Sequence, residues 1–412
     1  MKIDQSERAT PHPRRPSAGL LAPHVNGFVA SLLREGYKLK SVEEKRGLVM
    51  DLGRWMERRR LLLARLDEEQ LTRFQISRQR RRRLQGRDMW TARQLLRYLR
   101  DVGCVPMPRE RTDRRPLARL IQHFERYLSI DRCLLPSTIM SYTQIVIQFL
   151  KDRFGNTIRV KELRRHDVHH FIIRHLKTSN RGQAQRAVKA LRSFLRFLHQ
   201  CNKIAIDLSA AVPGVAYWRM SQLPRSLPPN QIKQLLASCD RTTPLGQRDY
   251  AILLLMARLG LRAGEVAKMT LDDLDWVPGE IVVRGKFQQE DRLPLPTDVG
   301  VALVTYLRYA RPNCSTRQVF IRMYAPRRGL KGQSSIGRVV RSALKRAGLN
   351  PDFKGSHLLR HSLATNLQRR GATLTEIGQL LRHNDLSTTQ IYAKVDIAAL
   401  RTIALPWPRG AL

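Results

Sequence analysis

Length, composition and charge point to a nucleic-acid partner. The 412 residues are 42% hydrophobic, which is ample for two to four domains with buried cores. The sequence carries 75 Lys and Arg against 34 Asp and Glu, a formal net charge of +41. Because such a charge repels itself unless a polyanion neutralises it, we expect DNA or RNA as the partner; a basic ribosomal or chromatin-type protein without chemistry is the alternative.

Other features argue against a membrane, secreted or zinc-binding protein. The most apolar run, 251–257, is stopped by Arg258 and is too short to span a bilayer. No apolar signal segment follows Met1. The five cysteines are dispersed without a C-x-x-C pair, which is typical of free thiols in a reducing cytoplasm.

The first half of the chain is predicted to be helical. Residues 1–20 are polar and proline-containing, so we expect a disordered tail. Apolar residues then recur at helical spacing through 21–110, which we interpret as an additional N-terminal domain. A break rich in Pro, Arg and Asp at 106–116 precedes a second helical domain, 111–205.

The two helical blocks resemble each other in sequence. Three apolar motifs of the first recur in the second: Phe28 with Phe124, each followed four residues later by Leu, 71–74 with 168–171, and 95–99 with 194–198. The offsets are 96, 97 and 99 residues, a drift that loop insertions would explain. Internal duplication is one interpretation, and the general likeness of amphipathic helices is the other.

The second half is predicted to mix helices with a small sheet. Residues 206–229 hold four prolines and little periodicity, as a linker would. We expect a domain over 230–405 and a short tail at 406–412. Within the domain, 280–284 and 292–295 read as the two strands of a β-hairpin.

Cationic residues and a tyrosine gather in the stretch from His357 to Tyr392. His357 and Arg360 are three residues apart, so they share one face of a helix. A guanidinium group can fork onto two oxygens of a phosphate, which suits such a pair to phosphate binding. A tyrosine close to that site is a candidate nucleophile.

Four motifs resemble the tyrosine recombinases, the phage-integrase-like family. In chain order they are Gly260-Leu-Arg262-Ala-Gly-Glu265, Gly285-Lys286 in the hairpin, His357-x-x-Arg360-His361, and Leu380-Leu-Arg-His383 with Tyr392 nine residues on. The match covers about 117–395 and is strong from Arg248 onward.

The resemblance implies a mainly α fold and a DNA strand-exchange enzyme. Helical N-terminal DNA-binding domains, with 111–205 as the core-binding domain, would precede an α+β catalytic domain with a small antiparallel sheet. The activity implied is that of a site-specific recombinase of integrase or transposase type, belonging to a mobile element. Duplex DNA would be the partner and a homotetramer on DNA the assembly, with sister recombinases as further partners, in a bacterial cytoplasm and associated with the nucleoid.

The resemblance also implies roles around the scissile phosphate. Arg262 and Arg360 would hold its non-bridging oxygens, and His383 would donate a hydrogen bond to it. Lys286 would be the general acid for the leaving 5′ oxygen. It is the only lysine in the hairpin, although Phe287 and Asp291 stand where the family often has glycine and a basic residue.

The remaining roles concern the nucleophile. Tyr392 would form a 3′-phosphotyrosyl link, with His357 assisting proton transfer. Because the covalent link stores the bond energy, neither ATP nor a metal ion is required as a cofactor. We expect Glu265 to pair with an arginine or a backbone amide, and His361 to point elsewhere on its helix, in a packing or supporting role.

Basic residues outside this set are predicted to contact DNA. They include the charge run at 80–83, for which a solvated helix face or loop is the alternative. The eight predicted residues are Arg80, Arg81, Arg82, Arg83, Arg181, Arg186, Lys189 and Lys354.

Three other functions are alternatives to recombination. A type IB topoisomerase shares the chemistry but nicks one strand and acts alone. A catalytically inactive relic would only bind DNA, which an intact set of six candidate residues argues against. A metal-dependent transposase needs a trio of carboxylates, and none stands out in the sequence.

Overall fold

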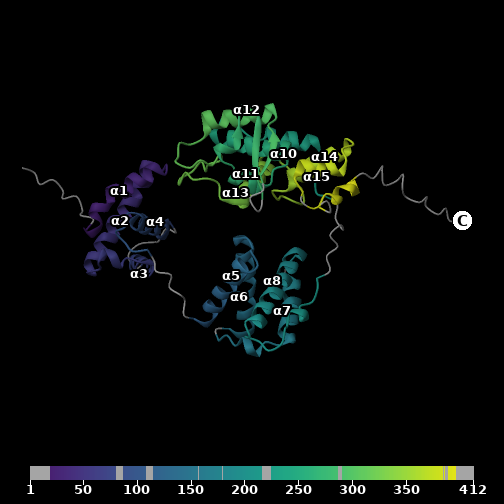
Figure 1. The fold of residues 1–412 in the computed structure, drawn as a ribbon. Coiled ribbons are helices and arrows are strands. Elements are labelled where there is room, and N and C mark those ends of the chain that lie inside the picture. The colour runs from purple at the N-terminus through teal and green to yellow at the C-terminus, as the bar shows by residue number, and fades with distance from the viewer. Residues whose placement is uncertain are drawn as a thin grey trace, which may run out of the picture. The chain divides into compact units, whose positions relative to one another are not determined.

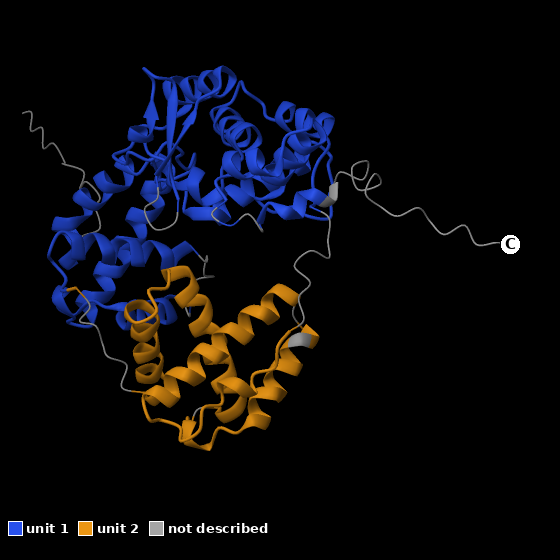
Figure 2. Ribbon diagram, turned by 45° about the vertical axis from the view of Figure 1, so that its right-hand side comes forward, with its two compact units in different colours: residues 1–106, 222–412 blue, residues 107–221 orange. Residues whose placement is uncertain are grey.

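The computed structural model describes residues 19–79, 87–107, 115–155, 157–178, 180–215, 224–285, 290–383, 385 and 388–395 (Figure 1). Helices dominate this part of the chain, and a small antiparallel sheet accompanies them, which confirms the predicted fold class. The chain divides into two compact units: 1–106 with 222–412, and 107–221 (Figure 2). No described helix is both long enough and apolar enough to cross a membrane.

The first helical block has its own hydrophobic core. Its α-helices among the described residues are α1 (Ala22–Arg34), α2 (Leu39–Arg58), α3 (Glu68–Gln79) and α4 (Arg87–Asp101). Apolar side chains spaced three and four residues apart give each of these helices a buried stripe. Phe28, Met56 and Leu95 lie at the centre of the resulting cluster and are at most 1% exposed.

The second block is built in the same way within the unit 107–221. Its α-helices in the described chain are α5 (Pro116–Ile130), α6 (Pro136–Phe154), α7 (Arg165–Thr178) and α8 (Arg181–Gln200). Asn180 caps α8, because its side chain accepts a hydrogen bond from the backbone N–H of Gln183. Leu208 and Val212 belong to the same core, so part of the segment expected as a linker packs with these helices.

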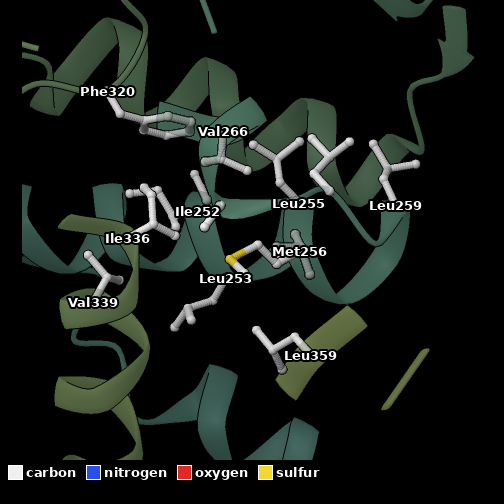
Figure 3. Packing of buried hydrophobic residues seen from close by; sticks show 14 of the residues in the cluster. Ile252, Leu253, Leu255, Met256, Leu259, Val266, Phe320, Ile336, Val339 and Leu359 are labelled. Atoms are coloured by element: carbon white, nitrogen blue, oxygen red, sulfur yellow. The ribbon is translucent and has the colours of Figure 1, made fainter. Parts of the chain in front are cut away.

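The C-terminal block surrounds one buried helix. Its α-helices in the described chain are α9 (Pro229–Ala237), α10 (Pro244–Leu259), α11 (Ala263–Lys268), α12 (Thr297–Thr305), α13 (Gly332–Arg346), α14 (Leu358–Arg369) and α15 (Leu374–Leu381). Helix α10 is apolar on nearly all sides, and Ile252, Leu253 and Met256 are fully buried among residues of α11, α13 and α14 (Figure 3). It therefore fixes the elements that carry the candidate site.

The predicted hairpin is present. Strands β2 (Glu280–Arg284) and β3 (Glu290–Pro294) pair antiparallel with Val282 opposite Arg292, and β1 (Leu274–Asp275) pairs with the other edge of β2. Buried Ile281 and Val283 alternate with more exposed neighbours, as a strand with one face on the core requires.

Candidate active site

Arg262 lies at the tight turn between α10 and α11. Gly260 ends α10 in the left-handed conformation, φ +60°, which a glycine adopts without steric cost. Glu265 then fixes Arg262 twice: its carboxylate accepts from the backbone N–H at 2.7 Å and from Nη1 at 2.8 Å. The expected pairing of Glu265 with an arginine and a backbone amide is confirmed. The Arg262 side chain remains 37% exposed, so its guanidinium can reach a ligand.

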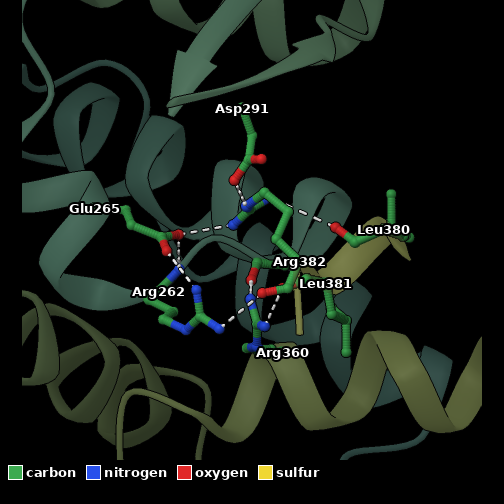
Figure 4. Close-up of polar contacts among 8 residues, drawn as sticks. Arg262, Glu265, Asp291, Arg360, Leu380, Leu381 and Arg382 are labelled. Carbon is green, nitrogen blue, oxygen red and sulfur yellow. Dashed lines mark hydrogen bonds and ion pairs between the residues drawn. The ribbon is translucent and has the colours of Figure 1, made fainter. Parts of the chain in front are cut away.

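Arg360 is the buried guanidinium of the site. It extends from α14 and is 3% exposed. Its Nη1 donates to the carbonyl of Gly260 at 2.6 Å, and its Nη2 donates to the carbonyl of Leu381 (Figure 4). Burial, with the neighbouring arginine charges, lowers its pKa to about 10, so it stays charged at neutral pH. A guanidinium has five N–H donors, and these two bonds leave donors for a phosphate.

Three histidines surround the arginine pair. Burial and the charges of Arg360 and Arg262 lower the pKa of His357, which directly precedes α14, and bring that of His383 to about 4. Burial, followed by the electrostatic effects of His357 and Arg360, also lowers the pKa of His361 to about 4. All three rings are therefore neutral at pH 7. His383 holds Thr389, with Nδ1 2.8 Å from Oγ1.

Tyr392 is buried beside His361. It lies on the short 3-10 helix Gln390–Val395, is 1% exposed, and packs in a small apolar cluster that includes Ile377 and Leu381. Its Oη lies 2.8 Å from Nδ1 of His361, and burial raises its pKa to about 12. The expectation that His361 points away from the site is therefore wrong. His361 directly follows Arg360 on α14, and the 3-10 helix that carries Tyr392 packs against α14.

Arg382 is a residue of this site that the sequence did not single out. It ends α15 in the left-handed conformation, φ +53°, where glycine or asparagine is usual. Its buried guanidinium donates to Glu265 at 2.7 Å and lies 3.7 Å from Asp291 of β3, while its carbonyl accepts from Arg262 at 3.1 Å (Figure 4). An arginine directly after a helix end, where a small residue was expected, was the available signal.

The structure thus brings most of the predicted set together. Five of its members lie close together: Arg262, His357, Arg360, His383 and Tyr392. The charge of Arg360 contributes to the pKa shifts of both histidines and of the tyrosine. Lys286 and the charge run at 80–83 lie outside the described residues.

The other predicted DNA contacts are surface residues. Arg181, Arg186 and Lys189 are exposed on α8, and Lys354 is exposed before α14. None of them belongs to the cluster around Tyr392. In the part of the chain that the structure describes, no group of three His, Cys, Asp or Glu is placed to hold a metal ion.

Sequence comparison finds relatives over most of the chain. Residues 225–398 match the phage integrase family. The Sinorhizobium fredii (strain NBRC 101917 / NGR234) protein y4rA, described as an integrase/recombinase, is 42% identical over 400 residues, covering 96% of this chain and 97% of that protein. The tyrosine recombinase XerD of Listeria innocua is 31% identical, covering 69% of this chain and 96% of its own length.

Solved structures share the fold. The XerH site-specific recombinase bound to its palindromic difH substrate covers 95% of this chain and 97% of its own, with a TM-score of 0.52 at 15% identity. The Tn1549 transposon integrase in complex with circular intermediate DNA covers 70% of this chain and 99% of its own, with the same score and identity. The chain belongs to the phage integrase family and is a tyrosine recombinase, an enzyme that breaks and rejoins DNA.

Proposed function

We propose that Tyr392 cuts duplex DNA at specific sites by forming a 3′-phosphotyrosyl intermediate. The observation that carries this proposal is the hydrogen bond between Tyr392 and His361, 2.8 Å long, beside Arg360. This contact supports the proposal because a hydroxyl, a ring nitrogen that can accept a proton and a fixed cation lie within one small cluster. That combination suits attack on a phosphodiester.

The two catalytic arginines would stabilise the transition state. Negative charge gathers on the equatorial oxygens of the phosphorus, and fixed guanidinium groups oppose it without reorganising. Arg262 is held by Glu265 and Arg360 by two carbonyls, so both are oriented before DNA arrives. His383 would donate a hydrogen bond to the same phosphate.

Two proton transfers complete the step. The leaving 5′ alkoxide must gain a proton, which we assign to Lys286; a positioned acid contributes about 100- to 10,000-fold. The tyrosine must lose one, and His361 is the acceptor that the geometry favours over His357. With pKa values of about 12 and about 4, the proton stays on Tyr392 at rest. A bound phosphate adds negative charge, which raises the pKa of the histidine and permits transfer during attack.

The assembly would be a homotetramer that exchanges strands between two DNA sites through a Holliday junction. The 5′ hydroxyl of a partner strand would attack the phosphotyrosyl bond and release Tyr392, so atoms and charge balance without ATP or a metal ion. The integrase and transposon relatives favour a mobile element as the source, with sister recombinases as further partners. Two duplexes in one complex would distinguish this enzyme from a topoisomerase, which acts on one.

We also propose a division of labour along the chain. Residues 111–205, with Arg181, Arg186 and Lys189 on α8, would form a core-binding domain that grips the duplex opposite the catalytic domain, 230–405. Lys354 would contact the backbone near the scissile phosphate. Residues 21–110, with the charge run at 80–83, would add a further DNA-binding domain.

A nicked suicide duplex tests the proposed chemistry. The substrate carries an inverted repeat to be identified in the DNA that flanks the gene, with a nick close to the scissile phosphate, so that the short leaving strand diffuses away. We expect a covalent protein–DNA adduct in EDTA that Tyr392→Phe abolishes. An adduct that survives this substitution would overturn the proposal, as would dependence on a divalent metal.

A further inference from the structure

The two helical blocks share one helix arrangement. In each, the first helix packs on the second and the fourth, the second on the fourth, and the third on the fourth: α1 to α4 in the first block and α5 to α8 in the second (Figure 1). A short 3-10 helix precedes the third helix in both, at Leu63–Arg65 and at Val160–Glu162. Amphipathic helices alone do not produce the same pairing and the same connection.

Buried positions match at the offsets read from the sequence. The equivalent residues are all buried: Phe28 and Phe124, Leu32 and Leu128, Leu66 and Leu163, Leu71 and Val168, Phe74 and Phe171, Ala92 and Leu191, Leu95 and Phe194, Leu96 and Leu195, Leu99 and Leu198, and Val105 and Ile204. The offset grows from 96 through 97 to 99 residues along the chain. Within each helix that holds two or more of these positions, the offset is constant.

Aromatic contacts repeat as well. Phe28 meets Tyr98 with ring centroids 5.6 Å apart, and Phe124 meets Phe197 at the equivalent place, 5.4 Å apart. Between the second and third helices, Trp55 and Phe74 form an edge-on pair at 5.6 Å. In the second block Phe171, the counterpart of Phe74, forms an edge-on pair at 5.3 Å with Phe149, which lies one turn before the counterpart of Trp55. The first block is therefore a second copy of the core-binding fold.

The two copies also share arginines on the fourth helix, one of which, Arg192, is half-buried and donates to the carbonyl of Val212 at 2.9 Å. Helices α4 and α8 carry arginine at three positions related by the same 99-residue offset as their buried stripes: Arg87 and Arg186, Arg93 and Arg192, and Arg97 and Arg196. Arg87, Arg93 and Arg97 are all exposed. Arg93 and Arg97 are one turn apart, so they present their charges on one side of α4.

We propose that α4 is a second DNA-binding helix, on which Arg87, Arg93 and Arg97 contact backbone phosphates of duplex DNA. The proposal rests on the proposed function only in that α8 grips DNA in the second copy. Core packing accounts for the shared apolar stripe but not for the arginines at the first and third matched positions, which are exposed in both copies. A row of guanidinium groups on one helix matches the regularly spaced phosphates of a duplex. Each protomer would then hold DNA with two copies of one module.

The test compares two triple variants of the full-length protein on a long duplex that extends about 30 base pairs beyond the inverted repeat, a margin of some three helical turns. The first replaces Arg87, Arg93 and Arg97 with Gln. The control replaces Arg34, Lys40 and Arg73 with Gln; these residues are exposed on α1, α2 and α3. Their counterparts in the second copy are not arginine or lysine but Ile130, Ser137 and His170. Both variants lose the same charge, so a nonspecific effect of net charge would be equal in the two.

The readout is the slope of log affinity against log salt. Each lost phosphate contact reduces the slope by about 0.9. We expect the slope of the first variant to be shallower than that of the wild type by about two to three units, and that of the control by less than about one unit. An unchanged slope, or an equal loss in the control, would overturn the proposal. Equal melting temperatures check that neither variant unfolds, as expected because Arg93 forms an exposed pair with Glu68.

Failure of this inference is separable from failure of the proposed function. Covalent adduct formation by the wild-type protein on the suicide duplex reports the chemistry. The salt slope reports the α4 surface, whether or not the adduct forms.

Discussion

At the scale of single residues, the contact between Tyr392 and His361 would keep the proposed nucleophile at rest. The hydroxyl is buried, hydrogen-bonded and protonated, with a pKa of about 12 beside a ring whose pKa is about 4. Such a pair cannot react until a phosphate changes the local charge. For the proposed nucleophile, this arrangement would prevent reaction in the absence of DNA and would link attack to DNA binding.

The substitution His361→Asn distinguishes two roles of this residue: holding the Tyr392 hydroxyl by a hydrogen bond, and accepting its proton. His361→Asn keeps a polar atom near the position of Nδ1 but cannot accept a proton. We expect single-turnover cleavage of the suicide duplex to fall about 100-fold or more, with DNA affinity unchanged. His357→Asn is the matched control, and a larger loss in that variant, with His361→Asn near wild type, would assign the proton to His357.

The buried histidines predict a pH dependence of stability. Their pKa values are lowered in the folded state, to about 4 for His361 and His383, so between pH 6.5 and 4 the unfolded chain binds more protons than the folded one. Stability is therefore full above about pH 6.5 and is lost as the pH falls toward 4. Urea unfolding of the protein across this range measures the effect. His361→Asn should flatten the dependence, and a wild-type midpoint that is constant from pH 7 to 4 would contradict the assigned burial.

Arg382 predicts a coupled loss of stability and rate. Arg382→Gly relieves the left-handed backbone but removes one cation from buried Glu265, whose side chain is 7% exposed. Breaking a buried pair costs about 3–5 kcal/mol, and relief of the backbone returns about 1–2 kcal/mol. We expect a lower melting temperature and slower cleavage at saturating DNA, because Glu265 no longer fixes Arg262.

Arg382→Lys supplies the control for that substitution. It retains the charge and the strained backbone, so part of the cleavage rate should return. A glycine variant as stable and as fast as the wild type would show that Arg382 has no positioning role.

The residue scale is where sequence reasoning was least complete. Motif spacing predicted Arg262, Arg360 and Tyr392, which lie close together in the structure, because chemistry restricts those residue types. It misplaced His361, since its partner is 31 positions away along the chain. It missed Arg382, since the contacts that give this side chain a role come from α11 and β3. Such partners are set by tertiary packing, which local patterns do not encode.

At the scale of elements, the turn after α10 joins packing to the site. Gly260 has φ +60°, and a Cβ there would meet the Leu381 side chain at 2.7 Å and that of Leu363 at 3.2 Å. Its carbonyl also accepts a hydrogen bond from Arg360. The turn therefore needs glycine both for its left-handed conformation and for the lack of space around it. The carbonyl of this turn also helps to position the buried guanidinium of Arg360.

Gly260→Ala tests this turn against a matched position. Gly348 has φ +66° and open space around it, so Gly348→Ala suffers only the backbone strain of about 1–2 kcal/mol. We expect Gly260→Ala to destabilise the protein clearly more in urea unfolding and to slow cleavage, while Gly348→Ala leaves the cleavage rate near wild type. Equal effects of the two substitutions would show that the space around Gly260 is not needed.

Elements were the most predictable part of the fold. The hairpin followed from alternation between 280 and 295, and its strands pair as expected. The apolar stripes of both helical blocks were readable because each block buries its own core. Whether the blocks were copies was left open by the sequence, since the decisive observations are which helices pack together and which aromatic rings meet.

At the scale of the whole molecule, the charge of +41 suits an enzyme that binds DNA through several modules. Two helical copies and a catalytic domain would spread phosphate contacts along a duplex, which lowers the self-repulsion of the chain on binding. The site around Tyr392 would then meet its phosphate only when the surrounding modules hold the DNA. Cleavage of the DNA would in this way depend on its prior binding by the other modules.

The most direct test of the account is the identity of the residue bound to DNA. The adduct formed on the suicide duplex is digested with nuclease and protease, and mass spectrometry locates the nucleotide remnant. The account predicts a 3′-phosphate ester on the peptide that contains Tyr392, in EDTA and without ATP. A remnant on any other residue, or cleaved DNA without a covalent adduct, would contradict it.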